Sequence, residues 1–95
     1  TFDRLIEEMI VDCYGEDEQR CAFLTYLQDN VPVPFEASLA GEDIQVIGFD
    51  GTAKRIQACC KRNGKTYKID VLDIELPEKM PERKWIDVYR YWCNE

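Results

Sequence analysis

The chain contains no histidine among its 95 residues. Acid–base catalysis by an imidazole and zinc sites with histidine ligands are therefore excluded. The sequence also lacks a CxxC spacing and its five cysteines are an odd number, so it fits neither a disulfide framework nor a zinc ribbon. We expect the cysteines to be small buried thiols of a protein in a reducing compartment.

Signals for export or for membrane attachment are lacking as well. The sequence shows no signal peptide, no apolar run long enough to cross a membrane and no lipidation motif. We therefore expect a cytoplasmic protein with no membrane partner.

Basic residues are few and are concentrated in one segment, although the net charge is −7 overall. Residues 1–50 carry twelve acids and two bases, residues 51–68 carry six bases and no acid, and residues 69–95 carry seven acids and four bases. Nucleic acid is a disfavoured partner for the whole chain, since a polyanion requires a positive footprint. The distribution predicts an electrically polar molecule.

The first 30 residues have the pattern of a helical hairpin within a single domain, 1–95. Apolar residues recur at three- and four-residue spacing over residues 1–13, which predicts an amphipathic helix with Thr1 as its cap. Tyr14 and Gly15 interrupt the pattern, and a second, largely apolar helix is predicted over residues 16–29. The short connection favours a hairpin over residues 1–30.

The pattern changes to a two-residue period after the Val31–Pro34 exit, which predicts a β region over residues 35–76. Asn63-Gly64 is a strong signal for a tight hairpin. The sequence therefore predicts an α+β fold with a small bent antiparallel sheet or SH3-like barrel of about five strands. The expected strands are 35–39, 44–49, 55–61, 65–69 and a fifth strand, or a turn and a short strand, over 71–76.

A proline-bounded linker over residues 77–84 precedes a C-terminal helix, which we place within residues 82–95. Trp85, Val88, Tyr89 and Trp92 give this helix an aromatic face. We expect that face to pack against the sheet or the helical hairpin.

Acidic residues are the candidates for a metal site. Carboxylates at the start of the second helix also complement the helix dipole, so Glu16, Asp17 and Glu18 are open to a capping or a metal-binding interpretation. Asp29 lies in the last turn, where a carboxylate needs compensation by a cation, a cap or solvent. Glu16 and Asp29 are too far apart to share one ion, about 20 Å along a helix. The hard oxygen ligands favour calcium, although no EF-hand loop is present.

The run from Val11 to Phe35, VDCYGEDEQRCAFLTYLQDNVPVPF, resembles the opening segment of the small acidic CcbP-like calcium-binding proteins. The resemblance covers about a quarter of the chain closely and the strand and hairpin after it more loosely. It implies a cytosolic non-EF-hand protein that binds more than one calcium ion at acidic surface sites, as a buffer or sensor. The matched acids are Asp12, Glu18 and Asp29. Glu16 and Asp17 are added from their position in the acidic turn, and Asp73 and Glu75 as strand-borne acids expected near Asp29.

An alternative interpretation rests on the basic hairpin over residues 54–68. A small SH3-like module would bind a protein or nucleic acid there, or the positive lobe would meet the acidic pole of a second copy in self-association. A hairpin whose lysines only protect an edge strand has the same sequence. The basic residues are Lys54, Arg55, Lys61, Arg62, Lys65 and Lys68.

An enzyme is the least favoured class. A carboxylate pair such as Asp12 and Glu18 has the chemistry of a glycosidase, but 95 residues leave little room for a substrate cleft. We therefore expect calcium binding without catalysis.

Overall fold

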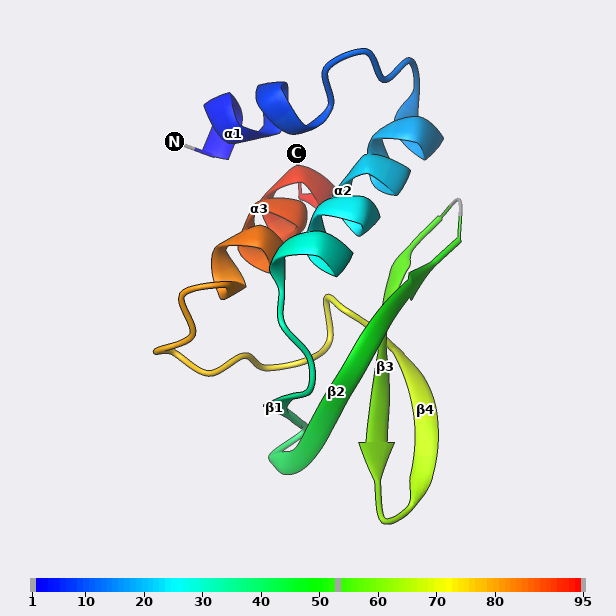
Figure 1. Ribbon diagram of the computed structural model, residues 1–95, viewed down its shortest axis with the longest axis vertical. Helices are drawn as coiled ribbons and strands as arrows, with labels where there is room; N and C mark the ends of the chain where they lie inside the picture. The colour runs from blue at the N-terminus through cyan, green and yellow to red at the C-terminus, as the bar shows by residue number, and fades with distance from the viewer. Residues whose placement is uncertain (1, 53, 95) are drawn as a thin grey trace.

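The computed structural model describes residues 2–52 and 54–94. Two helices precede a four-stranded sheet and a third helix follows it, so the α+β prediction is confirmed. Figure 1 shows the helices gathered at one end of the molecule and the sheet extending toward the other. The elements are α1 (Phe2–Met9), α2 (Glu16–Asn30), β1 (Phe35–Leu39), β2 (Glu42–Gly51), β3 (Ile56–Arg62), β4 (Lys65–Asp70) and α3 (Arg83–Cys93).

The sheet is an antiparallel meander in the order β1-β2-β3-β4. Asn63 and Gly64 both have positive φ, 51° and 77°, as the predicted tight hairpin requires. Ala40 and Gly41 make a second two-residue turn with φ of 52° and 81°. The register shifts between Val46 and Gly48, which places an irregularity in the long strand β2.

Segment 71–76 follows the second of the two predicted forms, a turn and a short paired stretch. Val71 donates its backbone N–H to the carbonyl oxygen of Ile56 at 3.0 Å. A single bridge follows, in which Ser38 of β1 and Glu75 exchange backbone hydrogen bonds of 2.9 and 2.7 Å. The chain after β4 therefore returns to the opposite edge of the sheet. An SH3-like barrel stays a prediction.

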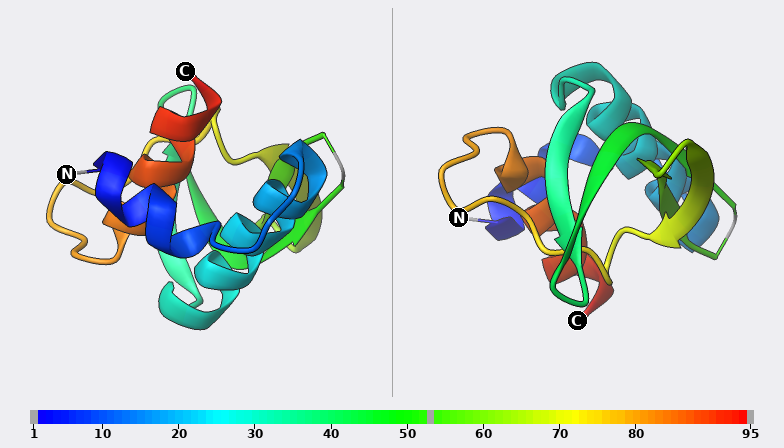
Figure 2. Two further views of the ribbon diagram at one scale, coloured as in Figure 1. Left: turned by 90° about the horizontal axis from the view of Figure 1, so that it is seen from above. Right: turned by 90° about the horizontal axis from the view of Figure 1, so that it is seen from below.

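The first helix is shorter than the sequence predicts. It ends at Met9 rather than Cys13, because the chain turns over the next residues and Asp12 adopts a positive φ of 67°. The expected cap, Thr1, lies outside the described residues. Helix α1 contacts both α2 and α3, so the predicted hairpin is part of a three-helix layer (Figure 2).

The aromatic face of α3 packs against α2, as expected. The ring of Phe23, which is fully buried, lies 5.5 Å from that of Tyr89 and 5.0 Å from that of Trp92. Tyr26 and Trp85 stack at 5.4 Å between the same two helices. Burial of these rings supplies much of the apolar area that holds the two helices together.

Tyr89 is also the polar centre of this interface. Its side chain is 1% exposed, and Arg20 of α2 and Cys93 are the polar groups that influence its hydroxyl. Burial raises the pKa of Tyr89 to about 12, from an ordinary value of 10.0.

Arg90 joins α3 to the turn after β4. Its Nη2 atom donates to the carbonyl oxygen of Val71 at 3.0 Å and to that of Ile74. Both of these residues are buried, so the guanidinium satisfies acceptors that water reaches poorly. The carboxylate of Asp87 lies 3.9 Å from the Nη1 atom of Arg90 and partly balances its positive charge. Arg90 therefore holds the segment that returns the chain to β1.

Arg90→Met should lower the free energy of unfolding by about 2 to 4 kcal/mol, because it leaves two buried carbonyls without a donor. Urea denaturation followed by circular dichroism measures this loss. Lys79→Met removes a positive charge from the exposed linker and serves as the control. Equal stability of the two variants would contradict the role assigned to Arg90.

Tyr89→Phe should change how stability depends on pH. A raised pKa in the folded state means that folding holds the phenol proton, so this contribution is complete below pH 10.0 and is lost as pH rises toward about 12. The loss amounts to about 1.4 kcal/mol per pH unit for one proton. Urea denaturation at a series of pH values should show a shallower decline for Tyr89→Phe than for wild type. Tyr14→Phe, at an exposed position, is the control, and equal slopes in all three proteins would refute the assignment.

Candidate functional site

The acidic loop, which we define as residues 10–18, comprises the connection from α1 to α2 and the first turn of α2, and it carries four of the predicted metal ligands. The carboxylate of Glu18 accepts the backbone N–H of Tyr14 at 2.7 Å. Gly15 has a φ of 127°, a conformation that other residues rarely adopt. These features fix the loop backbone, while the side chains of its acids remain exposed: Asp12, Glu16, Asp17 and Glu18.

Glu16 differs from the other acids of the loop because it faces a cation. Its carboxylate lies 3.4 Å from the guanidinium of Arg20, one helical turn later. Arg20 is only 9% exposed and lies over the ring of Trp92, 5.0 Å from its centre. Burial opposes the charge on Arg20, but Tyr89 and Glu16 beside it outweigh that effect and raise its pKa. Glu16 therefore serves the α2–α3 interface, which sequence reasoning missed.

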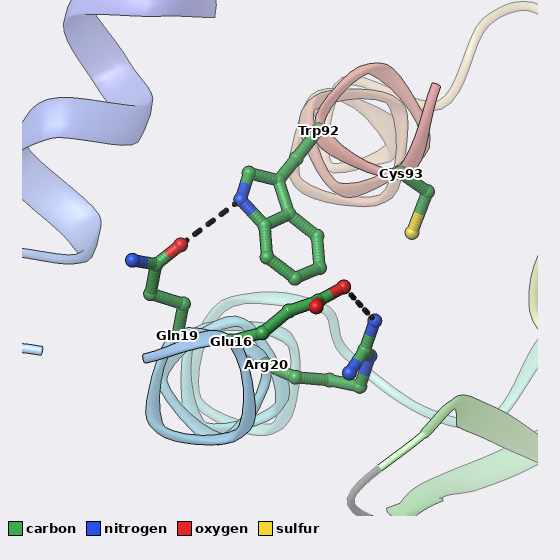
Figure 3. Close-up of a pocket in the computed structure, with 5 residues that line it drawn as sticks. All are labelled: Glu16, Gln19, Arg20, Trp92 and Cys93. Atoms are coloured by element: carbon green, nitrogen blue, oxygen red, sulfur yellow. Dashed lines mark hydrogen bonds and ion pairs between the residues drawn. The ribbon is translucent and has the colours of Figure 1, made fainter. Parts of the chain in front are cut away.

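A cavity of about 340 Å³ lies beside this pair, between α2 and α3 (Figure 3). Gln19 closes one side of it by accepting a hydrogen bond from the indole nitrogen of Trp92 at 3.2 Å. Cys93 lines the other side. Its lining offers one carboxylate, that of Glu16, so the cavity lacks the several oxygen ligands that a calcium ion requires.

The other three predicted ligands lie elsewhere. Asp29 is exposed in the last turn of α2, next to Asn30, whose side chain donates to the carbonyl of Tyr26 at 2.9 Å. Asp73 is exposed in the turn after β4, and its backbone N–H donates to Asp70 at 2.9 Å. Glu75 is exposed beside β1 through the bridge described above. The assignment of these residues to metal binding stays a prediction.

Glu75 does have acidic neighbours that the sequence analysis missed. A cavity of about 270 Å³ is lined by Glu75 together with Glu36 and Asp43, around the hydroxyl of Ser38. Ser38 is paired with Asp43 on one side and with Glu75 on the other, and directly opposite residues share a face of a sheet. Glu36, two residues earlier, lies on that face too. The hairpin register predicts part of this group, but the bridge to Glu75 is not visible in the sequence.

No three acidic or cysteine side chains within residues 2–52 and 54–94 lie close enough together to hold a metal ion. The chemistry of the donors nevertheless suits calcium, because the candidates are exposed carboxylates and the neighbouring turns offer carbonyl oxygens. The acidic residues fit the ion in kind, and their side chains are free to turn toward it.

The basic hairpin is partly neutralised by β2. Arg62 forms an ion pair with Glu42, and the Lys68 ammonium lies 2.7 Å from the carboxylate of Asp50. Lys68 lowers the pKa of Asp50, and Asp50 raises that of Lys68. The remaining bases of the prediction, Lys54, Arg55, Lys61 and Lys65, are exposed. The free positive charge is therefore smaller than the sequence indicates.

None of the helices within the described residues is both long and apolar enough to cross a membrane.

Comparison with known proteins gives two kinds of match. A family model described as calcium binding, Calci_bind_CcbP, matches residues 3–93. The crystal structure of Anabaena CcbP has a TM-score of 0.86 and 20% identity, over 97% of this chain and 88% of that one. A calcium-binding protein in its calcium-binding form has a TM-score of 0.83 and 20% identity, over 98% and 89%. No curated protein matches. At this identity the two structures establish the fold.

Proposed function

The chain belongs to the calcium-binding family whose model it matches over residues 3–93, and from this membership we propose that it binds calcium reversibly at acidic surface sites, as a buffer or sensor. Calcium is the ion expected for a member of this family. The observation that carries the proposal is the exposed acidic loop, because it offers several carboxylates to solvent in a chain of this family. The family is described as calcium binding, and this description supports a binding protein rather than an enzyme.

The chemistry of the exposed side chains supports this choice of ion. Calcium accepts roughly six to eight oxygen ligands in flexible geometry, from carboxylates, carbonyls and water. Softer metals select imidazole or clustered thiolate, and the chain has no histidine.

The first proposed site is the acidic loop. Asp12 and Glu18 are its principal ligands, and Asp17 is an additional carboxylate. The hydrogen bond from the Tyr14 N–H occupies one oxygen of Glu18 and orients the other, so the carboxylate can serve the loop and an ion together. Glu16 is held by Arg20 and contributes mainly charge.

The second proposed site is the cavity around Ser38. Asp43, Glu36 and Glu75 supply its carboxylates, and Asp73 lies close by in the chain. Asp29 is separate from the acidic loop, because it lies in the last turn of α2 whereas Glu18 lies in the first. We propose Asp29 as a further contact for an ion at that end of α2.

Reversible binding follows from how these acids are held. Their side chains are exposed and repel one another, so an ion that gathers them relieves repulsion but also costs side-chain entropy. The two effects oppose each other, which favours moderate affinity and rapid release. Both are properties of a buffer or sensor rather than of a structural metal site.

We also propose a cytoplasmic location, because all five cysteines are free. The interaction module is the second candidate function, and the pairing of Arg62 and Lys68 with acids of β2 counts against it.

Asp12→Asn combined with Glu18→Gln should remove one calcium ion from the binding stoichiometry, because both principal ligands of the acidic loop lose their charge. Isothermal titration calorimetry of the metal-stripped protein, with magnesium in excess, measures the change. Glu7→Gln combined with Glu78→Gln removes two exposed carboxylates elsewhere and is the control. Unchanged stoichiometry in the test variant, with the fold intact by circular dichroism, would refute this site.

Asp43→Asn combined with Glu75→Gln should remove a different calcium ion, since these residues belong to the cavity around Ser38. Both side chains are exposed, so the free energy of unfolding should change by less than about 1 kcal/mol. Combining this pair with the acidic-loop pair should abolish both titration steps. A quadruple variant that loses no more calcium than one of the pairs would show that only one of the two sites exists.

A further inference from the structure

The inner face of the sheet continues beyond the region that the helices cover. Residues directly opposite each other share a face, so Tyr67 lies on the same face as the buried Cys60, and Ile69 on that of the buried Ala58. Yet Tyr67 is 48% exposed, and strand β4 is otherwise mostly exposed. Part of the apolar face of the hairpin is therefore left uncovered.

The uncovered face forms a cavity of about 370 Å³, which we call the hairpin cavity. Its walls are mainly apolar. The hairpin turn and two cations lie at its rim, and both cations are paired with acids of β2, Arg62 with Glu42 and Lys68 with Asp50. Lys65 lies directly opposite Arg62 on the same face of the hairpin and is exposed, so it supplies positive charge at this rim. The cavity is lined by Leu39, Ile44, Tyr67, Ile69, Arg62, Lys68 and Asn63. An occupant suited to it has an apolar side chain flanked by negative charge.

The chain carries such an occupant in its own acidic loop. Tyr14 is 85% exposed and Val11 is 66% exposed, and these are the two most exposed large hydrophobic side chains within residues 2–52 and 54–94. Carboxylates surround them in the sequence VDCYGEDE. The hydrogen bond to Glu18 holds the Tyr14 backbone in place, so less backbone entropy is lost when the loop is bound.

The two surfaces cannot meet within one molecule. The long axis of the molecule is 41 Å, and Figure 1 shows the connection between α1 and α2 at one end of it and the β3–β4 turn at the other. We propose that the acidic loop of one copy docks into the hairpin cavity of a second copy, with Tyr14 as its apolar anchor. Opposite charges on the two surfaces steer the contact.

This contact is head to tail. Each copy offers one loop and one cavity, which are different surfaces, so association continues from copy to copy unless a ring closes. The contact rests on one aromatic anchor and a rim of exposed charges, and a small interface of this kind is weak. Association should therefore depend on protein concentration and weaken as salt rises.

Calcium should oppose this association, an effect that rests on the proposed function. An ion bound by Asp12 and Glu18 cancels negative charge on the loop that the cavity rim attracts. By linkage, association must lower calcium affinity by the same factor. Calcium release would then promote assembly, which turns ion binding into a change of oligomeric state.

The test uses sedimentation velocity of the full chain at low ionic strength with a calcium chelator. Wild type should show an average mass that rises with concentration. Tyr14→Lys and Tyr67→Glu should each weaken association about tenfold or more. Tyr14→Lys removes the apolar anchor of the loop, and Tyr67→Glu places a negative charge in the cavity. Leu72→Lys and Leu72→Glu make the same charge changes at an exposed position outside both surfaces and should associate like wild type.

A mixture of the two damaged proteins gives the sharpest result. Tyr14→Lys keeps its cavity and Tyr67→Glu keeps its loop, so together they should form a complex of one copy each and nothing larger. If Tyr67→Glu fails to fold by circular dichroism, Tyr67→Ser replaces it. Wild type that stays monomeric at every concentration, a mixture that does not associate, or association that increases with salt would each overturn the proposal.

Calcium binding is tested separately on the Tyr67→Glu protein, whose acidic loop is intact and which does not assemble. Calcium uptake by this variant, together with a monomeric wild type, would leave the proposed function standing and reject docking. Assembly of wild type without calcium uptake by the variant would support docking and reject the proposed function. If the variant binds calcium and wild type assembles, added calcium should shift wild type toward the monomer.

Discussion

The structure depends on the burial of the middle of α2. Phe23 and Leu27 are fully excluded from water, and both come from the middle of this helix. The helix contacts β2 on one side and α3 on another, so it must be apolar on more than one face. Gly51 shows how close the contact with the sheet is, because a Cβ atom there would lie 2.9 Å from Leu24. The acidic residues of α2 consequently lie in its first and last turns.

Burial of the middle of α2 explains why its acidic residues lie at its ends. The ends of a buried helix are the parts that solvent reaches, and the first turn favours carboxylates through the helix dipole. Glu18 stabilises the acidic loop and remains exposed to an ion, so capping and calcium binding are not competing explanations for it. Glu16, one turn before the buried Arg20, instead pairs with that guanidinium while remaining exposed itself. Neighbouring acids of the same turn thus have different roles because only one of them faces a cation.

The uneven charge of the chain has a structural counterpart. The acidic loop and the β3–β4 turn lie at opposite ends of the long axis (Figure 1). Acids of β2 neutralise Arg62 and Lys68 but leave Lys61 and Lys65 exposed. An ion that binds the acidic end therefore changes the charge difference between the two ends of the molecule. In the proposed self-association, this change would alter the oligomeric state.

Much of this protein could be predicted from its sequence, because the relevant signals are local. Helical periodicity located α2 and α3, Asn63-Gly64 located the tight hairpin, and the Val11–Phe35 run identified the calcium-binding family. Tertiary structure decided what depends on contacts between distant segments. It ended α1 at Met9, returned segment 71–76 to β1 through one bridge, and placed Glu36 and Asp43 beside Glu75. Such contacts depend on how the elements pack, and periodicity and turn chemistry carry no information about which distant side chains will share a surface.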